Sequence, residues 1–241
     1  MSFSLFFLNY SWLILLVLAI SSDVEVKIEE HYSNDYFEWQ KSIGYIGGKL
    51  NLFKFNALNI HEDDILLDFG CGGGFLLNNF NVKEKVCVEI NPTAQITARG
   101  FNIDVHNSLE TIPTESITKI ISNHALEHTA HPLNILTELH RVLKANGEII
   151  IVVPCEQSHE KLFHYDADDI NKHLYTWTPM SLGNLASRGG FEIVDSYGFH
   201  HSWPPDFKDT YQNDNFHDRC IQYAQDNQIV QVLLHARKKS K

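Results

Sequence analysis

Basic residues are scarce in this sequence. Lysine and arginine together number 19 against 30 aspartates and glutamates, which gives a formal net charge of −11 with histidine neutral. No lysine- or arginine-rich run precedes the short tail Arg237-Lys238-Lys239. Nucleic acids and anionic lipids attract basic surfaces. We therefore expect no nucleic-acid partner, and a small or neutral molecule instead.

Cysteine is also rare, and its spacing does not suggest metal binding or a disulfide framework. The four cysteines are Cys71, Cys87, Cys155 and Cys220, and no two of them form a C-x-x-C pair. Such pairs are typical of zinc sites, and small disulfide-rich proteins have more cysteines. We therefore expect buried free thiols in a reducing compartment.

The apolar run over residues 5–20 is shorter than the roughly 20 residues that a membrane-spanning helix needs. It has no Lys or Arg before it, unlike a secretory signal, although Ala19-Ile20-Ser21 would serve as a cleavage site. Residues 1–21 thus have three open interpretations: a start assigned too early or a leader without function, a membrane anchor, or a signal peptide. We expect a cytoplasmic location, with membrane association through residues 5–20 left open.

The stretch that organises the chain is residues 65–74, with the sequence ILLDFGCGGG. The apolar residues predict a buried parallel strand, and Asp68 then lies at its carboxyl end, where open α/β sheets bind their ligands. Glycine tolerates positive φ and has no Cβ, so the backbone can turn tightly and a ligand can approach it closely. A helix beginning at Phe75 would point its free N–H groups back at this turn.

A second acidic residue, Glu89, ends the next predicted strand, residues 86–90. It lies about 20 residues past the glycines, the usual distance for a carboxylate that accepts hydrogen bonds from ribose hydroxyls. A ribose-bearing cofactor is therefore expected across the first two strand ends. Asp68 would repel the pyrophosphate of a dinucleotide, whereas it suits the sulfonium and ammonium groups of S-adenosylmethionine.

The pattern Asp68-x-Gly70-x-Gly72-x-Gly74 followed by Glu89 resembles the first two motifs of the class I S-adenosylmethionine-dependent methyltransferases. A second match covers residues 122–154, where the pattern is L-E-H, then R-V-L-K-x-x-G, then an apolar strand. The resemblance spans roughly residues 62–199 and is to the small-molecule type, methyltransferase type 11/12-like. The chain departs from the family at Ser108 and Thr118, where the family usually has acidic residues.

The resemblance implies an α/β fold with a doubly wound, seven-stranded, mostly parallel sheet, the Rossmann-like methyltransferase fold, in which the last strand is antiparallel. Seven segments fit its strands: residues 63–68, 86–90, 103–106, 119–123, 148–153, 191–194 and 229–236. Four segments fit its helices: residues 75–80, 93–99, 133–143 and 179–187.

Three parts follow along the chain. Residues 1–21 are the apolar leader or membrane segment, residues 22–60 a helical lid, and residues 61–241 the methyltransferase domain, with an acceptor-side insertion at about residues 155–178. We predict the lid as a helix over residues 31–40, a turn containing Gly44, Gly47 and Gly48, and a helix over residues 49–55. Its aromatic residues either cover the cofactor or only anchor the segment to the core; they include Tyr36, Phe37 and Trp39.

The resemblance implies S-adenosyl-L-methionine as the cofactor. The positions that match the family's binding residues are Asp68, Gly70, Cys71, Gly72, Gly74, Glu89, Ile90, Ser108, Leu109 and Asn123. Because histidine can take a proton near neutral pH, His124 is the candidate catalytic base after the fourth strand. His128, His164 and His173 are the alternatives, and Glu127 with His128 can equally be structural. We predict no metal site, since His159, His164 and Asp166 lack a helical H-x-x-x-H pairing.

The predicted function is methyl transfer to oxygen or carbon of a small molecule, such as a glycan-pathway or lipid-like metabolite. Two alternatives remain open. One is a non-catalytic S-adenosylmethionine- or nucleotide-binding protein, which the departures at Ser108 and Thr118 would allow. The other is an NAD(P)-dependent oxidoreductase on a related fold, against which stand the missing G-x-x-G spacing and the acid before the glycines.

Overall fold

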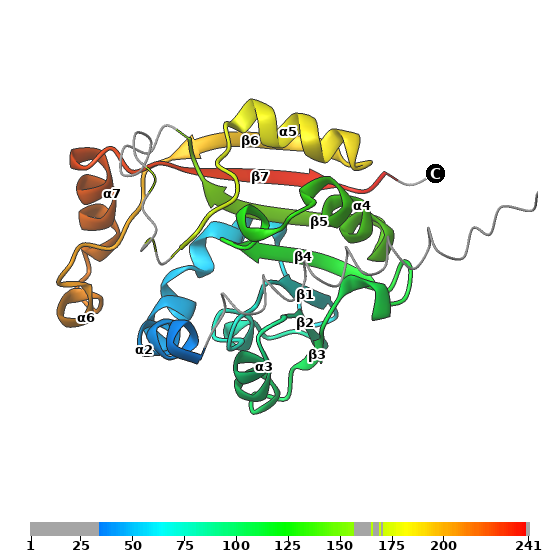
Figure 1. Ribbon diagram of the computed structural model, residues 1–241, viewed down its shortest axis with the longest axis horizontal. Helices are drawn as coiled ribbons and strands as arrows, with labels where there is room; N and C mark the ends of the chain where they lie inside the picture. Colours follow the sequence, from blue (N-terminus) through cyan, green and yellow to red (C-terminus); the bar gives the residue numbers. More distant parts are fainter. Residues whose placement is uncertain (1–33, 157–164, 166–168, 170, 240–241) are drawn as a thin grey trace, which may run out of the picture.

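A seven-stranded sheet with the order β3-β2-β1-β4-β5-β7-β6 runs through the computed structural model, which describes residues 34–156, 165, 169 and 171–239 (Figure 1). Strands β1 to β5 pair in parallel, and β7 is antiparallel to both of its neighbours, β5 and β6. This arrangement confirms the predicted fold class. The strands are β1 (Ile65–Phe69), β2 (Glu84–Val88), β3 (Asp104–His106), β4 (Ile117–Asn123), β5 (Leu143–Pro154), β6 (Glu192–Phe199) and β7 (Gln231–Arg237).

Helices cover both faces of the sheet, because side chains on its central strands alternate between two apolar layers. One layer joins Leu66 to the helix α3 (Pro92–Arg99) and to the 3₁₀ helices η1 (Leu52–Leu58) and η2 (Leu77–Asn79). The other joins Leu67 to α4 (Pro132–Val142) and α5 (Pro179–Arg188). Two further 3₁₀ helices follow strand ends, η3 (Leu109–Thr111) and η4 (Leu126–His128).

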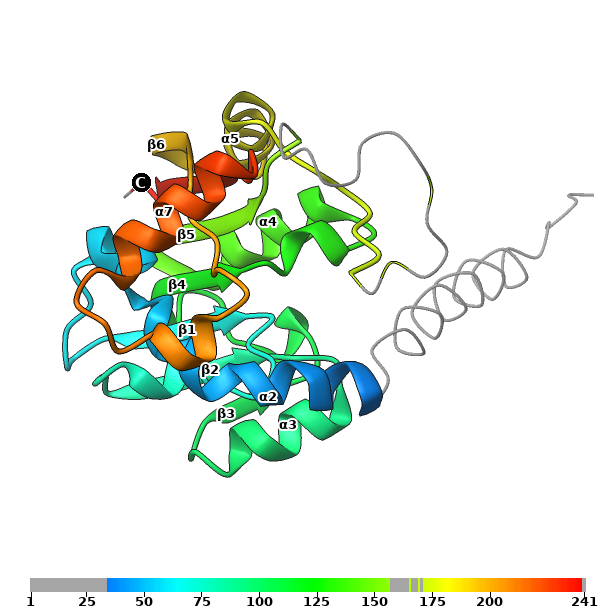
Figure 2. The same ribbon diagram turned by 90° about the vertical axis from the view of Figure 1, so that its left-hand side faces the viewer.

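Three further helices gather at the edge where the parallel strands end: α2 (Asn34–Leu50), α6 (Phe207–Thr210) and α7 (Phe216–Asp226). This edge is on the left in Figure 1 and faces the viewer in Figure 2. At this edge η1 packs against the segment that follows β6, since the rings of Phe53 and His201 lie 4.6 Å apart between centroids. The sequence predicted no helix over α6 or α7.

The predicted helix–turn–helix over residues 31–55 is wrong, because α2 is one continuous helix through its glycines. A Cβ built at Gly44 would lie 2.3 Å from the Phe75 ring, and one built at Gly48 would lie 2.3 Å from the Phe75 carbonyl oxygen. These glycines therefore allow close helix packing rather than a turn. The side chains of Tyr36, Phe37 and Trp39 lie outside the described part, so their role as a lid stays a prediction.

The predicted helix over residues 75–80 is also wrong, because only the short 3₁₀ helix η2 forms there. The side-chain amide of Asn79 donates a hydrogen bond of 2.7 Å to the Phe75 carbonyl, while its backbone N–H donates to Leu76 instead. Asparagine side chains compete with the backbone in this way, which removes the bond that an α-helix needs between these two residues.

The predicted location, cytoplasmic with membrane association through residues 5–20, is overturned. Among the residues that the structure describes, no helix has the length and apolar character needed to cross a bilayer. Residues 1–33, 157–164, 166–168 and 170 lie outside the described part. The domain boundaries at residues 21 and 60, and the insertion at about 155–178, therefore stay predictions.

Candidate functional site

The glycine-rich turn after β1 has a backbone that side chains would obstruct. Gly70, Gly72 and Gly74 have φ values of +76°, +53° and +76°, a conformation that L-residues rarely adopt. A Cβ built at Gly70 would lie 2.3 Å from the Ala125 Cβ, and one at Gly74 would lie 2.6 Å from the Ile103 side chain. The alternating glycines are therefore required by the backbone conformation and by the close packing around the turn.

Glu89 ties this turn to the end of β2. One oxygen of its carboxylate accepts a hydrogen bond of 2.8 Å from the Gly72 N–H, and the other accepts one of 2.8 Å from the Asn91 N–H. Burial raises the pKa of Glu89, and the backbone N–H groups of Asn91, Gly72 and Ile90 oppose that rise. Glu89 and the glycine turn, whose spacing in the sequence suggested a shared site, are thus in direct contact in the folded chain.

Asp68, near the end of β1, lies close enough to Glu89 to feel its charge, and only 2% of the surface of Asp68 is exposed. Burial, together with the negative charge of Glu89, raises the pKa of Asp68 from 3.8 to about 8. A cationic ligand at this point would favour ionised Asp68 and Glu89, because opposite charges stabilise each other strongly where water is excluded. The strand ends are therefore chemically suited to a positively charged nucleoside.

Replacing Asp68 with asparagine should change how the free energy of unfolding depends on pH. With a folded pKa of about 8 against 3.8 unfolded, the folded protein keeps a proton that the unfolded chain releases between these values. Relative to Asp68→Asn, the wild type should be most stable below about pH 4. It should lose up to about 1.4 kcal/mol per pH unit toward pH 8. Urea unfolding at about pH 5 and pH 7.5 measures this, and an unchanged difference would contradict it.

The other predicted cofactor residues on this side line the same edge. The Glu89 N–H donates to the His106 carbonyl at 3.0 Å, so the residues that follow β3 lie next to the end of β2. Ser108 and Leu109 come there, at the start of η3, and Leu109 is 4% exposed. Ile90 is 36% exposed. Thr118 instead bonds Asp64 and Ile65 at the opposite, amino edge of the sheet, so its departure from the family pattern does not touch this site.

The predicted free thiols are wrong for two of the four cysteines. Cys71, in the glycine turn, forms a disulfide with Cys87 on β2, with their Cα atoms 5.7 Å apart. That separation suits a disulfide, and it arises because β1 and β2 are adjacent parallel strands. Cys155 and Cys220 are free and buried, as predicted.

At the end of β4, Asn123 and the following His124 join a polar network whose other members, Lys54 and Gln231, the sequence did not indicate. The Lys54 ammonium donates to Asn123 Oδ1 at 3.0 Å and to Gln231 Oε1 at 2.9 Å. Burial lowers the pKa of Lys54 to about 7, and the charge of Glu127 opposes this. Lys54 comes from η1 and Gln231 from β7, so no local pattern in the sequence signals this cluster.

His124 sits at the centre of this network in a strained backbone conformation, with φ of +54°. Its Nδ1 lies 3.2 Å from Glu127 Oε1, and its Nε2 lies 3.1 Å from Gln231 Oε1. Burial alone would raise the pKa of Glu127. The His124 hydrogen bond and the charges of His124 and His128 hold the pKa below its ordinary value. Glu127 is therefore an ionised, fully buried carboxylate that orients the His124 ring.

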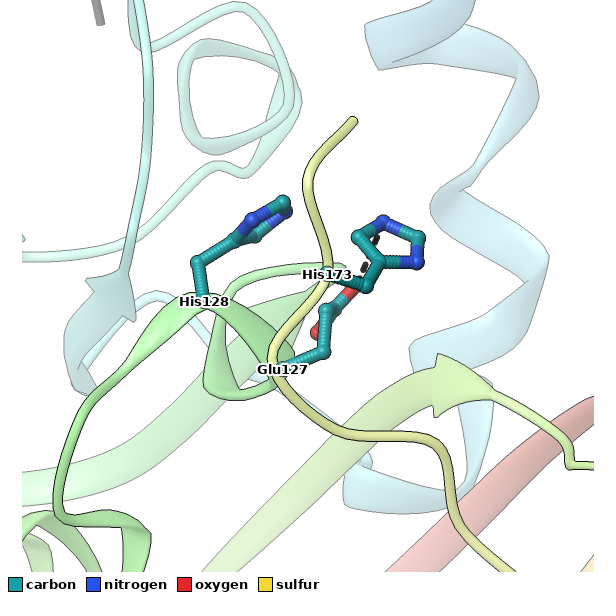
Figure 3. A group of neighbouring side chains, drawn as sticks. All are labelled: Glu127, His128 and His173. Carbon is teal, nitrogen blue, oxygen red and sulfur yellow. Dashed lines mark ion pairs between the residues drawn. The ribbon is translucent and has the colours of Figure 1, made fainter. Parts of the chain in front are cut away.

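Two of the alternative base candidates also meet at Glu127. The His173 Nε2 lies 3.9 Å from Glu127 Oε1, and the His128 and His173 rings lie 4.8 Å apart between centroids (Figure 3). The remaining base candidate, His164, lies outside the described residues. So do His159 and Asp166, so the prediction that these three residues bind no metal stays a prediction.

Comparison with protein-family models identifies a methyltransferase domain over residues 45–196, well over half of the chain. This span includes the glycine turn, Glu89, Lys54 and His124, but not Gln231. A search of curated proteins finds no match.

Solved methyltransferase structures share the fold at low identity. An S-adenosylmethionine-dependent methyltransferase from Thermotoga maritima aligns with a TM-score of 0.63 and 17% identity over 88% of this chain and 99% of its own. A chain of the Haloferax volcanii complex between the Trm112 methyltransferase activator and a methyltransferase aligns with 0.63 and 14%, over 86% and 99%. Haemonchus contortus phosphoethanolamine N-methyltransferase 2, in complex with S-adenosyl-L-methionine, aligns with 0.56 and 13%, over 80% and 53%.

The strand ends fit S-adenosylmethionine on their own chemistry, because a glycine-rich turn adjoins the buried Asp68 and the partly buried Glu89, two acids that a cation would stabilise. The family match sets aside the alternative of an NAD(P)-dependent oxidoreductase. From its matched domain and its sheet topology, this chain belongs to the methyltransferase domain family, as a class I enzyme that uses S-adenosyl-L-methionine.

Proposed function

We propose that the protein methylates a hydroxyl oxygen of a small molecule, which binds at the carboxyl ends of β4 and β5. The observation that carries this proposal is His124, a half-buried imidazole oriented by a buried carboxylate directly after β4. An activated sulfonium needs little help to leave, whereas a hydroxyl must lose a proton to become a good nucleophile. A positioned base is therefore most useful for an oxygen acceptor.

We assign the cofactor to the edge formed by β1, β2 and β3. When bound, S-adenosylmethionine supplies an activated methyl group. The turn at Gly70, Gly72 and Gly74 would leave room for it, Glu89 would accept hydrogen bonds from its ribose, and Asp68 would balance its positive charge. The remaining assigned residues would contact its other parts: the Cys71 backbone, Ile90, Ser108, Leu109 and Asn123.

The chain's own residues would hold the acceptor in place and take its proton. The Glu127 carboxylate accepts a hydrogen bond from Nδ1–H of His124, and Nε2 faces the Gln231 side-chain oxygen. The acceptor hydroxyl would have to take the place of that oxygen beside Nε2 for this nitrogen to receive its proton. The strained φ of His124 supports a functional role, since such conformations persist where the surrounding structure enforces them. Fixing a nucleophile in line with the transferred group supplies much of the rate of such reactions.

Replacing His124 with glutamine should lower kcat by about 100-fold or more while the affinity for S-adenosylhomocysteine stays within about twofold of wild type. Transfer of label from methyl-tritiated S-adenosylmethionine to a panel of phenols, sugars and other hydroxylated metabolites measures kcat. Isothermal calorimetry measures the affinity. His131→Gln is the matched control, because His131 is exposed and close in sequence.

Turnover of the His124→Gln protein at the wild-type rate would contradict the role of His124. If wild-type protein binds S-adenosylhomocysteine but labels no acceptor in the panel, the proposal of a small hydroxylated acceptor fails.

A further inference from the structure

We propose that Glu127, His128 and His173 bind one divalent transition-metal cation on the acceptor side of the site. Each offers one ligand atom, and these atoms all lie within 4.8 Å of one another. Figure 3 shows the two imidazole rings next to each other above the Glu127 carboxylate, with the ion pair between Glu127 and His173 marked. Two histidines and one carboxylate form a ligand set that proteins use for catalytic zinc and for non-haem iron.

The fold holds His173 beside Glu127 through the main chain. The carbonyl oxygen of Glu127 accepts hydrogen bonds from the N–H groups of Leu174 at 2.9 Å and Tyr175 at 3.2 Å. The Tyr175 hydroxyl adds a bond of 3.2 Å to the Ala130 carbonyl, so the two segments are joined on both sides of His128. This pairing brings together ligands that are 46 positions apart in the sequence (173 − 127).

A second, independent observation at Glu127 points to a cation. Its side chain is completely buried, and its Oε1 bonds His124. Its Oε2 has no hydrogen-bond partner among the residues that the structure describes. Leaving a buried carboxylate oxygen without a hydrogen-bond partner is unfavourable, and native proteins rarely do so. A metal ion bound by both carboxylate oxygens, Oε1 on the His173 side and Oε2, would give Oε2 its missing partner.

The chemistry of the ligands selects the kind of ion. Imidazole nitrogens suit Zn²⁺, Fe²⁺, Co²⁺ and Ni²⁺, whereas Mg²⁺ and Ca²⁺ prefer all-oxygen sites. Bonds of about 2.1 Å in a tetrahedral site would place the ligand atoms about 3.4 Å apart, so the side chains must close by up to about 1.4 Å. The His173 side chain is 25% exposed, which leaves it room to rotate.

Three protein ligands leave at least one coordination position open, as in catalytic zinc sites. On the proposed function, that position would take the acceptor's hydroxyl oxygen, because a divalent cation favours the deprotonated form of an oxygen bound to it. The substrate class is then a small molecule that presents a metal-binding hydroxyl next to the transferred methyl. Only this last step rests on the proposed function, since cation binding itself does not require an acceptor.

Titration with Co²⁺ of full-length protein stripped with a chelator tests the site directly. We expect one Co²⁺ per chain with visible d–d absorption, and loss of that absorption on addition of Zn²⁺. His173→Ala and Glu127→Gln should each weaken Co²⁺ binding by at least about 10-fold. His131→Ala should bind as the wild type does, because His131 is exposed and outside the cluster.

Circular dichroism and S-adenosylhomocysteine binding in chelator show whether each variant is folded. If Glu127→Gln does not fold, His173→Ala alone decides, since its ring is partly exposed. Absence of stoichiometric Co²⁺ absorption in the wild type, or equal binding by His173→Ala and His131→Ala, would overturn the site. Cofactor binding without Co²⁺ binding refutes only the metal, whereas Co²⁺ binding without methyl transfer refutes only the acceptor assignment.

Discussion

Replacing Gly72 with valine should weaken binding of S-adenosylmethionine and S-adenosylhomocysteine by more than about 100-fold, which is about 2.7 kcal/mol, in a protein that still folds. Gly72 has φ of +53°. Holding a β-branched residue in this left-handed conformation would cost roughly 1–2 kcal/mol, so valine favours a different backbone conformation of the turn. The same change would misplace the N–H that Glu89 accepts at 2.8 Å. Both effects act on the surface that the cofactor is proposed to touch.

The matched comparison for Gly72 is a pair of alanine variants. Gly72→Ala should lose part of the affinity for the cofactor, less than Gly72→Val does. Gly183→Ala should bind the cofactor as the wild type does. Gly183 lies within α5, where an added Cβ would meet nothing closer than 3.9 Å. Calorimetry with S-adenosylhomocysteine gives the affinities, and circular dichroism shows whether the fold is kept. Wild-type affinity in a folded Gly72→Val protein would remove the glycine turn from the cofactor site.

Replacing Glu89 with alanine should weaken cofactor binding by about 100-fold. The carboxylate accepts the N–H groups of Gly72 and Asn91, and hydrogen bonds to charged groups contribute about 1.5–3 kcal/mol each. Without it, the turn loses its anchor to β2 and the ribose loses its proposed acceptor. The pKa of Asp68 should also fall, because the negative charge of Glu89 contributes to raising it.

Glu84→Ala is the control for Glu89, since Glu84 is an exposed residue at the opposite end of the same strand. It should bind the cofactor like the wild type. Glu89→Gln separates the two roles of the carboxylate, because it keeps an oxygen acceptor but loses the charge. If the Glu89→Ala and Glu84→Ala proteins have equal affinities, Glu89 does not contact the cofactor.

The strands of the sheet could be predicted because each carries a local signal. The apolar parts of β1 and β5, residues 65–67 and 149–153, are largely buried and form continuous apolar runs in the sequence. The more polar start of β5, residues 143–148, carries no such signal, and the predicted strand began at residue 148. The helix α3 is likewise signalled locally, since Asn91 caps it and Pro92 begins it. Glycine was less informative: the same residue type makes a turn at Gly72 and a tight helix contact at Gly48.

The cofactor half of the candidate site could also be predicted from local signals in the sequence. Glu89 and the glycines lie on consecutive strands, so their spacing along the chain already implies that they meet. Lys54, Gln231 and His173 reach the end of β4 from distant segments, and only the folded chain brings them together. The Cys71–Cys87 disulfide is an intermediate case, because adjacency of the first two strands would have suggested it.

Calorimetric titration of the folded wild-type protein with S-adenosylmethionine, and then with S-adenosylhomocysteine, tests the cofactor site most directly. We predict one site per chain for each molecule and no binding of NADH in the same cell. Retention of both affinities by a folded Gly72→Val, Glu89→Ala double variant would contradict the assigned residues. Absence of heat with either molecule, for protein shown to be folded, would contradict the site as a whole.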